Sequence, residues 1–427
     1  MRNYRPTAAL AVSMLCCIHP AIAQTTPKPA AVQELRGMWV VRTNLLSPQS
    51  IQHVVELAKK HHYNALFVQV RGRGDAFYQS TLEPRSEELD GTPADFDPLQ
   101  TLLPLAHQSG LQVHAWVNSC YVWGSPKFPK AKNHIINAHR DWLCRDSKGN
   151  FLMTQGKECE GAFLSPANPA ARKHIHDVLL DIATRYDIDG IHLDYIRYPS
   201  AAYDYSSAAM QHFQQDLTPT LTPQQNRSLT IKARHDRLAY VHAFPAQFAD
   251  FRRRQVTELV RSISQDVKAA KPWIVMSAAV FADAKDARVA RGQDWKTWLK
   301  LGYLDAVAPM AYGVSTPKVA LQIADAVKAA HDAGKFAYAG IGAWHISAES
   351  AAAKINAARA LGAQGSILFS YGGVTKDGAN DLYLDALDRR CYTKPATLPT
   401  MTWLPARDEA QTAKGRTESP STPLTKG

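Results

Sequence analysis

Residues 65–71 read Ala-Leu-Phe-Val-Gln-Val-Arg, an apolar run that turns polar at its end. Residues 51–62 before it and residues 99–109 after it carry apolar side chains at helical spacing. An apolar strand between two helices is typical of a parallel sheet that helices cover on both faces. This stretch therefore predicts an α/β fold built from parallel strands.

The strand-then-helix pattern recurs along the chain, and eight segments have the character of buried strands. These segments are residues 36–42, 65–71, 112–118, 190–198, 274–281, 305–312, 336–342 and 366–371. Eight is the strand number of the closed (β/α)8 barrel, or TIM barrel. A doubly wound open sheet is the alternative, but the chain lacks the Gly-rich first turn typical of that fold. We therefore predict an α/β fold of the TIM-barrel type.

The predicted helices begin with recognisable signals. Ser47-Pro48, Asp97-Pro98 and Asn168-Pro169 each pair a capping residue with a proline, which the first turn of a helix tolerates. Two insertions interrupt the repeat, residues 120–166 after the third strand and residues 200–240 after the fourth. Barrels place their active sites at the C-terminal ends of the strands. We expect the insertions to form walls of a cleft there, with surface decoration as the alternative.

The N-terminal residues have the pattern of a secretory signal peptide. Arg2 and Arg5 supply positive charge, residues 8–18 are apolar, and Ala21-Ile22-Ala23 resembles a cleavage site. The apolar run is shorter than the roughly 20 residues of a membrane-spanning helix, so no stable membrane insertion is expected. We predict a signal peptide over residues 1–23, cleavage near Ala23 and a periplasmic or secreted protein.

The remaining chain divides into one domain and a tail. Residues 34–391 contain the barrel pattern, whereas residues 392–427 are rich in Pro, Thr, Lys and Ser and are predicted to be disordered. Four cysteines follow the signal peptide, and we favour a disulfide between Cys144 and Cys159 because both lie in one loop-like stretch. Free buried thiols are the alternative.

The composition is that of a globular protein with a basic surface. The 427 residues include 49 Lys and Arg and 38 Asp and Glu, which gives a formal net charge of +11. No long basic run, P-loop, zinc finger or GxGxxG loop is present, so neither nucleic acid nor a nucleotide cofactor is indicated. A basic surface also suits an enzyme that acts on a carboxylate-bearing polymer.

The fourth predicted strand is the richest in polar side chains. Residues 189–199 read Asp-Gly-Ile-His-Leu-Asp-Tyr-Ile-Arg-Tyr-Pro. Alternation places His192 and Asp194 on one side and Tyr195 and Arg197 on the other. A carboxylate inside an apolar strand is costly unless it is paired, so Asp194 must have partners. The alternative to a functional role is a buried ion pair between Asp194 and a nearby arginine, either Arg71 or Arg197.

Several ordered segments together resemble the glycosyl-hydrolase-like 10 family, also described as family 10 glycosylhydrolases. These segments are residues 35–40, 64–71, 110–118, 189–199, 272–281, 293–295 and 305–312. The resemblance covers roughly residues 34–387. It implies a (β/α)8 barrel and a secreted or periplasmic glycoside hydrolase without a cofactor. It also implies a bacterial cell-wall polysaccharide as substrate, with the peptidoglycan glycan strand as the best-supported class.

Glycoside hydrolysis normally requires two carboxyl groups that flank the bond. The resemblance implies that Asp194 is the nucleophile or transition-state stabiliser. Ile196 occupies the position of the catalytic Glu in the similar chitinase-type motif, so that mechanism is not supported. We expect Asp283, just past the fifth strand, to be the proton donor. The other candidates for this role are Asp294, Asp75 and Glu83.

Sugar rings bind to aromatic faces and to fixed polar groups, so we expect such residues at the strand ends. The predicted substrate-binding residues are Arg71, Trp116, Asn118, His192, Tyr195, Arg197, Met310, Tyr312, Trp344 and Tyr371. The arginines and Asn118 are expected to bind hydroxyl groups or a carboxylate of the glycan.

Two other functions are compatible with the sequence. A metal-dependent barrel hydrolase would use clustered histidines such as His114 and His192, but the usual His-x-His pair is absent and we predict no metal. A non-catalytic barrel that binds cell-wall glycan is the second alternative. It would be supported by the lack of a second carboxylate in the cleft.

Overall fold

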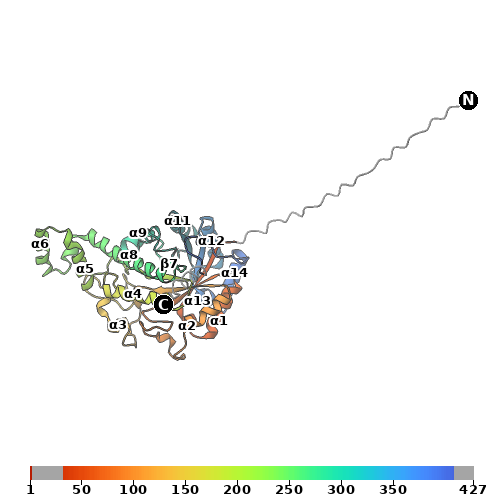
Figure 1. Ribbon diagram of the computed structural model, residues 1–427, viewed down its shortest axis with the longest axis horizontal. Coiled ribbons are helices and arrows are strands. Elements are labelled where there is room, and N and C mark those ends of the chain that lie inside the picture. The colour runs from red at the N-terminus through yellow and green to blue at the C-terminus, as the bar shows by residue number, and fades with distance from the viewer. Residues whose placement is uncertain (2–31, 408–427) are drawn as a thin grey trace, which may run out of the picture. The chain divides into compact units, whose positions relative to one another are not determined.

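In the computed structural model of the protein, the described residues are Met1 and residues 32–407. Eight parallel strands close into a barrel in the order β1, β10, β9, β8, β7, β6, β3 and β2, and helices surround it (Figure 1). The barrel strands are β1 (Leu35–Val40), β2 (Ala65–Arg71), β3 (Gln112–Asn118), β6 (Gly190–Asp194), β7 (Val275–Val280), β8 (Ala306–Pro309), β9 (Phe336–Gly342) and β10 (Gly365–Phe369). The predicted TIM barrel is confirmed.

The strand prediction fails most clearly at the end of β6. This strand ends at Asp194 instead of continuing to residue 198, because Tyr195 adopts a left-handed backbone with φ of +48°. A side chain in this region costs roughly 1–2 kcal/mol, and the conformation ends the extended pairing. The alternation assumed for the residues after Asp194 therefore does not apply.

The helices that follow the barrel strands begin where the capping signals predict. Ser47 accepts a hydrogen bond from the Ser50 amide at 3.1 Å, and Asp97 and Asn168 cap their helices in the same way. The main surrounding helices are α1 (Pro48–Lys60), α2 (Pro98–Gln108), α4 (Pro169–Arg185), α8 (Pro245–Ala270), α9 (Ala284–Arg291), α10 (Trp295–Lys300), α11 (Thr316–Asp332), α12 (Ala348–Ala360), α13 (Tyr371–Thr375) and α14 (Leu382–Arg390).

The core has two parts, as expected when both faces of each strand are buried. Side chains such as Trp39, Phe67 and Ile367 fill the barrel. Their neighbours along the same strands, such as Leu66 and Val68, pack outward against the helices. This alternation leaves polar side chains free to emerge only at the strand ends.

The two insertions have different surroundings. The first contains a short ribbon of β4 (Tyr121–Trp123) and β5 (Ala162–Phe163) and the small helix α3 (Ile135–Ala138). The second contains α5 (Ser207–Leu217), α6 (Pro223–Ala233) and α7 (Ala239–Ala243). The second packs a cluster of its own, centred on Phe213, against Phe248 and Phe251 of α8.

Part of the predicted disordered tail is ordered. Residues 392–407 lie against the N-terminal ends of the barrel strands, where Leu398 and Met401 join the apolar core. Trp403 donates a 2.8 Å hydrogen bond to Asp305 and anchors this segment. The prediction was wrong here because a few apolar side chains fix the segment, although its composition is polar. The predicted signal peptide and the rest of the tail lie outside the described residues.

No helix within residues 32–407 is both long and apolar enough to cross a membrane.

Candidate active site

A pocket of about 270 Å³ opens where the C-terminal ends of the barrel strands meet. Its lining residues belong to several barrel strands and to the turns that follow the strands. They are Trp39, Val41, Arg42, Gln69, Trp116, Asn118, Asp194, Tyr195, Arg197, Ala279, Met310, Tyr312 and Phe369. This is the end of the barrel at which TIM-barrel enzymes carry their active sites.

Asp194 is the only carboxylate among the described residues that line this pocket. It is the last residue of β6 and pairs in register with Asn118 at the end of β3. Trp116 Nε1 donates a 3.0 Å hydrogen bond to Asp194 Oδ2, and the Tyr195 amide donates one of 2.7 Å to Oδ1. Both oxygens of Asp194 are thus held in a fixed orientation.

The surroundings of Asp194 act on its pKa in opposite directions. Burial raises the pKa of this carboxyl above its ordinary value, while Arg197 and the two N–H donors lower it, and the net change is upward. Arg197 Nη1 lies 3.8 Å from Asp194 Oδ1. A desolvated carboxylate that is held by N–H donors is suited to stabilise positive charge or to attack an electrophilic carbon.

One wall of the pocket is aromatic. Tyr312 and Phe369 have ring centroids 5.7 Å apart, and Trp39 lies 5.9 Å from Phe369. Trp344 extends this wall outward, since its ring lies 5.2 Å from that of Tyr312 and the residue is 47% exposed. Flat apolar faces of this kind match the faces of sugar rings.

The opposite wall is polar, and its two arginines are paired with carboxylates. Arg42 donates a 2.8 Å hydrogen bond to Gln69, and Arg197 lies beside Asp194. Asn118 donates to the Gly72 carbonyl at 2.9 Å, and its buried Oδ1 has no hydrogen-bond partner among the described residues. The wall therefore presents the polar side chains of Arg42, Asn118 and Arg197 to the pocket.

Most of the predicted substrate-binding residues meet in this pocket. The structure brings together Trp116, Asn118, Tyr195, Arg197, Met310 and Tyr312 around Asp194, and Trp344 lies at the edge. The sequence reasoning missed Trp39, Arg42, Gln69 and Phe369. Each of these residues lies in or beside a predicted strand end. Their positions therefore indicated pocket residues, although their side-chain types did not.

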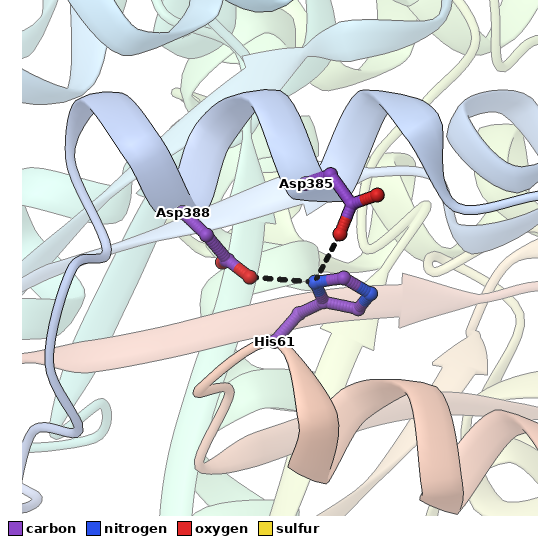
Figure 2. A group of neighbouring side chains, drawn as sticks. All are labelled: His61, Asp385 and Asp388. Carbon is purple, nitrogen blue, oxygen red and sulfur yellow. Dashed lines mark hydrogen bonds and ion pairs between the residues drawn. The ribbon is translucent and has the colours of Figure 1, made fainter.

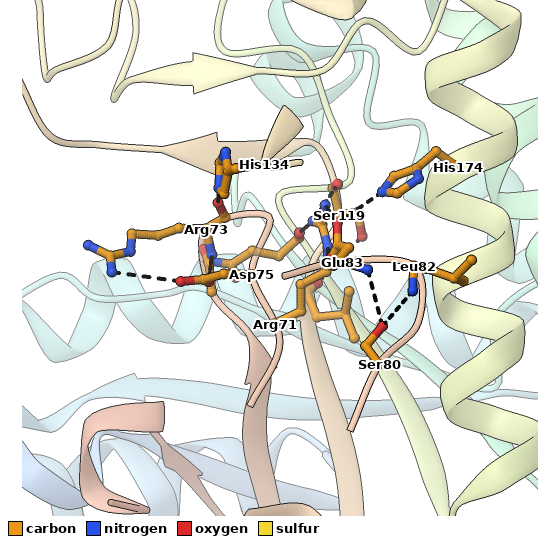
Figure 3. Close-up of polar contacts among 12 residues, drawn as sticks. Arg71, Arg73, Asp75, Ser80, Leu82, Glu83, Ser119, His134 and His174 are labelled. Carbon is orange, nitrogen blue, oxygen red and sulfur yellow. Dashed lines mark hydrogen bonds and ion pairs between the residues drawn. The ribbon is translucent and has the colours of Figure 1, made fainter. Parts of the chain in front are cut away.

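Arg71 does not line the pocket, contrary to the prediction. Its side chain is buried and pairs with Glu83 through contacts of 2.6 and 2.7 Å, and it also donates to the carbonyls of Asn118 and Ser119 (Figure 3). The pairing of β2 with β3 shifts register between Gln69 and Arg71. This irregularity turns Gln69 toward the pocket and Arg71 away from it.

His192 also lies outside the pocket. It is fully buried inside the barrel, where its Nε2 is 3.1 Å from Trp39 Nε1 and its Nδ1 is 2.9 Å from Ser277 Oγ. Burial lowers the pKa of His192 well below its ordinary value. It contacts Trp39, which lines the pocket, but does not line the pocket itself, contrary to the prediction.

Asp283 is not placed to donate a proton in this pocket. It is exposed and caps α9, accepting hydrogen bonds from the amides of Lys285 and Asp286 at 2.9 and 3.0 Å. The strand it follows ends at Val280, so the chain has already turned outward at this residue.

The other predicted candidates for the proton donor are also engaged elsewhere. Asp75 accepts from Ser86 at 2.7 Å, Glu83 is paired with Arg71, and Asp294 pairs with Arg288 at 3.2 Å. Asp294 precedes α10, but its side chain makes no capping hydrogen bond.

Tyr371 is buried beside a second, polar pocket, away from Asp194. This pocket, of about 270 Å³, is also lined by Thr43, Asn44, Ser50, His53 and Asp377. Tyr371 therefore lines this second pocket and not the one around Asp194, contrary to the prediction of a single cleft.

The predicted disulfide between Cys144 and Cys159 is not formed. Both residues are buried free thiols. Cys144 Sγ lies 3.4 Å from the Leu164 carbonyl and Cys159 Sγ lies 2.7 Å from the Gly161 carbonyl. Each thiol is thus directed at a carbonyl on its own side of the loop, which corresponds to the alternative of free buried thiols.

A group of side chains with metal-binding chemistry lies outside the barrel pocket, where α1 meets α14. Among the described residues, His61, Asp385 and Asp388 bring potential ligand atoms within 4.8 Å of one another (Figure 2). His61 Nδ1 is 2.7 Å from Asp388, and its Nε2 is 3.0 Å from Asp381. The imidazole is already held at both nitrogens, which indicates an ionic link between the two helices.

The sequence comparisons agree with the geometry of the barrel. The sequence profile described as glycosyl hydrolase-like 10 matches residues 34–351. The chain is 26% identical over 421 residues to the glycosyl hydrolase YngK of Bacillus subtilis (strain 168), covering 87% of this chain and 74% of that protein. It is 25% identical over 366 residues to the glycosyl hydrolase DigH of Escherichia coli (strain K12), covering 72% of this chain and 75% of that protein.

Solved structures share the fold. The PgaB (BpsB) glycoside hydrolase domain of Bordetella bronchiseptica superimposes with a TM-score of 0.60 at 15% identity, over 83% of this chain and 99% of that chain. The catalytic domain of a β-amylase from Paenibacillus polymyxa also gives a TM-score of 0.60, at 13% identity, over 86% of this chain and 100% of that chain. At these identities the similarity concerns the fold alone.

Proposed function

The chain belongs to the glycosyl hydrolase-like 10 family, and we propose that it is a glycoside hydrolase of a bacterial cell-wall polysaccharide, the glycan strand of peptidoglycan. The observation that carries this proposal is Asp194, a desolvated carboxylate held by two N–H donors beside an aromatic wall. A carboxylate in this position can balance the positive charge that develops at an anomeric carbon. We assign it the role of nucleophile or transition-state stabiliser.

The lining of the pocket supports an anionic glycan as the substrate. Tyr312 and Trp344 offer ring faces to sugars, while Arg197 and Arg42 offer donors to hydroxyl groups or carboxylates. Peptidoglycan strands carry carboxylates on every second sugar, and a formal net charge of +11 favours encounter with such a polymer.

Export follows from the same proposal, since the substrate lies outside the cytoplasm. The charged and apolar pattern of residues 1–23 and the small residues before Gln24 are typical of a cleaved signal peptide. N-terminal sequencing of protein recovered from the periplasm or medium tests this. A mature chain that begins near Gln24 is the expected result, and an intact N-terminus in the cytoplasm would contradict it.

The test of the activity is digestion of purified glycan strands, with and without stem peptides, alongside amylose and mannan. Mass analysis of the soluble products is expected to show fragments from the glycan strands, and their reducing ends identify the bond that is cleaved. Release from amylose or mannan alone would assign a different substrate.

A non-catalytic glycan-binding barrel is the second candidate function. One observation favours it, namely that Asp194 is the only carboxylate among the described residues of the pocket. Sedimentation of the protein with intact strands, without any soluble fragments, would support this alternative.

A further inference from the structure

We propose that Glu160, in the insertion after β3, is the second carboxyl group of the site and exchanges the proton with the glycosidic oxygen. This inference rests on the proposed function, because it assigns the partner of Asp194 in that reaction. Among the described residues, the lining of the pocket contains one carboxylate, Asp194, and Glu160 would supply the second from the insertion that follows β3.

Glu160 has a carboxylate oxygen that is not engaged elsewhere. Its Oε1 accepts a 3.2 Å hydrogen bond from Arg197, while its Oε2 is buried and has no hydrogen-bond partner among residues 32–407. Glu88, the other glutamate near the pocket, differs because both of its oxygens pair with arginines. Its contacts with Arg42 are 2.6 and 3.0 Å, and its contact with Arg73 is 3.1 Å. Glu160 is therefore the carboxylate with a free oxygen.

Arg197 connects Glu160 directly to Asp194. Its Nη2 lies 3.2 Å from Glu160 Oε1, and its Nη1 lies 3.8 Å from Asp194 Oδ1. Because both nitrogens belong to one planar guanidinium, the two carboxylates are arranged around a single cation. Arg197 Nη1 and Nε are buried and have no hydrogen-bond partner among the described residues.

The connecting guanidinium is fixed in place. The Arg197 side chain is 4% exposed and lies over the ring of Tyr195 at 4.0 Å and over that of Phe281 at 4.9 Å. A guanidinium between two aromatic rings is held in its plane. The relative placement of the two carboxylates is thus set by packing and not by a mobile side chain.

The backbone of the insertion positions Glu160 through its neighbours. Gly161 has φ of +151°, and a Cβ at this position would lie 2.2 Å from the Trp123 carbonyl oxygen. The close approach is possible only for glycine and holds the segment against β4. The Cys159 carbonyl accepts a 2.8 Å hydrogen bond from the Gly156 amide, which closes the loop on the other side.

The proposed step balances as a hydrolysis. The proton on the Glu160 carboxyl group passes to the glycosidic oxygen, which takes the electron pair of the breaking bond to the anomeric carbon. Asp194, as a carboxylate, stabilises the positive charge on that carbon. A water oxygen then bonds to the anomeric carbon, and the proton that this water loses restores the carboxylic acid of Glu160.

The electrostatic surroundings agree with two acids that affect each other. The charge of Glu160 contributes to the raised pKa of Asp194, in which burial is the largest cause and which Arg197 opposes. The titratable and charged groups that face these two carboxylates are Arg197, Tyr121, Cys159, Tyr195 and Tyr312. Arg197 is the cation that lies between the two carboxylates.

The test compares Glu160→Gln and Glu160→Ala with wild type on purified glycan strands across pH. Glu158→Gln is the matched control, because Glu158 is exposed and lies two residues away in the same loop. We expect Glu160→Gln to lose about 100- to 10,000-fold in kcat and to lose the alkaline limb of the pH profile, with an unchanged Tm. Formate is expected to restore part of the rate of Glu160→Ala, because it supplies a carboxyl group to the vacated position.

The outcomes separate this inference from the proposed function. If wild type cleaves the strands and Glu160→Gln matches Glu158→Gln, Glu160 has no catalytic role although the glycosidase assignment stands. If Glu160→Gln is slow but keeps the alkaline limb, and formate does not act on Glu160→Ala, Glu160 only positions Arg197 and the proposal is wrong. If wild type releases no fragments, the proposed function fails and this inference fails with it.

Discussion

The indole Nε1 of Trp116 donates a 3.0 Å hydrogen bond to Oδ2 of Asp194, which joins the C-terminal ends of the neighbouring strands β3 and β6. This bond fixes one carboxylate oxygen and, as an N–H donor, lowers the pKa of Asp194 against the stronger effect of burial. The orientation and the ionisation of Asp194 therefore depend on Trp116. The N–H donor of this side chain can be removed by a substitution that keeps an aromatic ring.

Trp116→Phe is expected to reduce kcat/KM by about 10- to 100-fold, since a hydrogen bond to a charged group contributes about 1.5–3 kcal/mol. The loss of the donor raises the pKa of Asp194 further, so the acid limb of the pH–rate profile should move to higher pH. Trp123→Phe is the control, because Trp123 Nε1 donates to the Lys127 carbonyl at 2.8 Å, outside the pocket. An unmoved acid limb in Trp116→Phe would contradict the role of this bond.

Trp344→Ala should weaken glycan binding without loss of stability. Trp344 is 47% exposed and extends the aromatic wall of the pocket, so its ring is available to a sugar. A stacking contact of about 1 kcal/mol corresponds to a roughly fivefold rise in KM or Kd. Isothermal titration with glycan oligomers measures it, and Phe128→Ala, at 49% exposure in the first insertion, is the control. Equal affinities of the two variants would remove Trp344 from the binding surface.

Glu83→Gln should destabilise the fold, because it leaves the buried guanidinium of Arg71 without its counter-ion. Breaking a buried ion pair costs about 3–5 kcal/mol, which urea denaturation at neutral pH measures. Glu158→Gln, in an exposed position, should change the free energy of unfolding little.

The same pair predicts an acid-sensitive stability. Burial acts to raise the pKa of Glu83, but the charge of Arg71 and the hydrogen bonds from His174 and Arg71 lower it to about 2 from 4.5. A lowered folded-state pKa gives stability that is present above pH 4.5 and is lost as the pH falls toward 2. Wild type should lose free energy of unfolding across this window more steeply than Glu83→Gln, and parallel curves would contradict this account.

The link between α1 and α14 predicts a pH dependence of the opposite sign. Burial lowers the pKa of His61, but hydrogen bonds to Asp388 and Asp381 outweigh it and leave the pKa raised above 6.5. The charged groups that face His61 are Lys60, Asp381, Asp385 and Asp388. A raised folded-state pKa gives stability that is full below pH 6.5 and is lost as the pH rises through the folded-state pKa.

Thermal denaturation of wild type and His61→Gln between pH 5.5 and 9 measures this contribution. The difference in Tm between the two should be largest at the acidic end and should shrink as the pH rises. His242→Gln is the control, since His242 pairs with Asp236 on an exposed surface. A constant difference in Tm between wild type and His61→Gln would show that the charge of His61 does not stabilise the fold.

The sequence predicts the barrel well because each strand is a short apolar run between capped helices. Residues 65–71, 112–118 and 336–342 coincide with β2, β3 and β9, since their ends are marked by polar or glycine residues. Asp194 could be identified because a carboxylate at the end of an apolar strand is costly to bury unless it has partners or a function. Trp116 and Asn118 followed from their position at the end of the neighbouring strand.

The remaining parts of the site depend on local geometry that the sequence pattern does not contain. A register shift separates the directions of Gln69 and Arg71, which strict alternation would place on one face, and the left-handed turn at Tyr195 ends β6 early. The predicted end of the fifth strand differs from that of β7 by one residue, but Asp283 lies beyond it and caps α9 instead of entering the pocket. Glu160 lies in an irregular insertion without periodicity, so only the folded position of Arg197 reveals it.

The most direct test of the central claim is the release of soluble fragments from purified peptidoglycan glycan strands by wild type and by Asp194→Asn, measured by mass spectrometry. Asp194→Asn preserves the size of the side chain, and its Tm and its binding to the strands provide the controls for folding and substrate recognition. We predict fragments from wild type alone, with both proteins folded and bound to the strands. Equal release by both proteins, or binding without release by either, would contradict the assignment of Asp194 as the centre of a glycosidase.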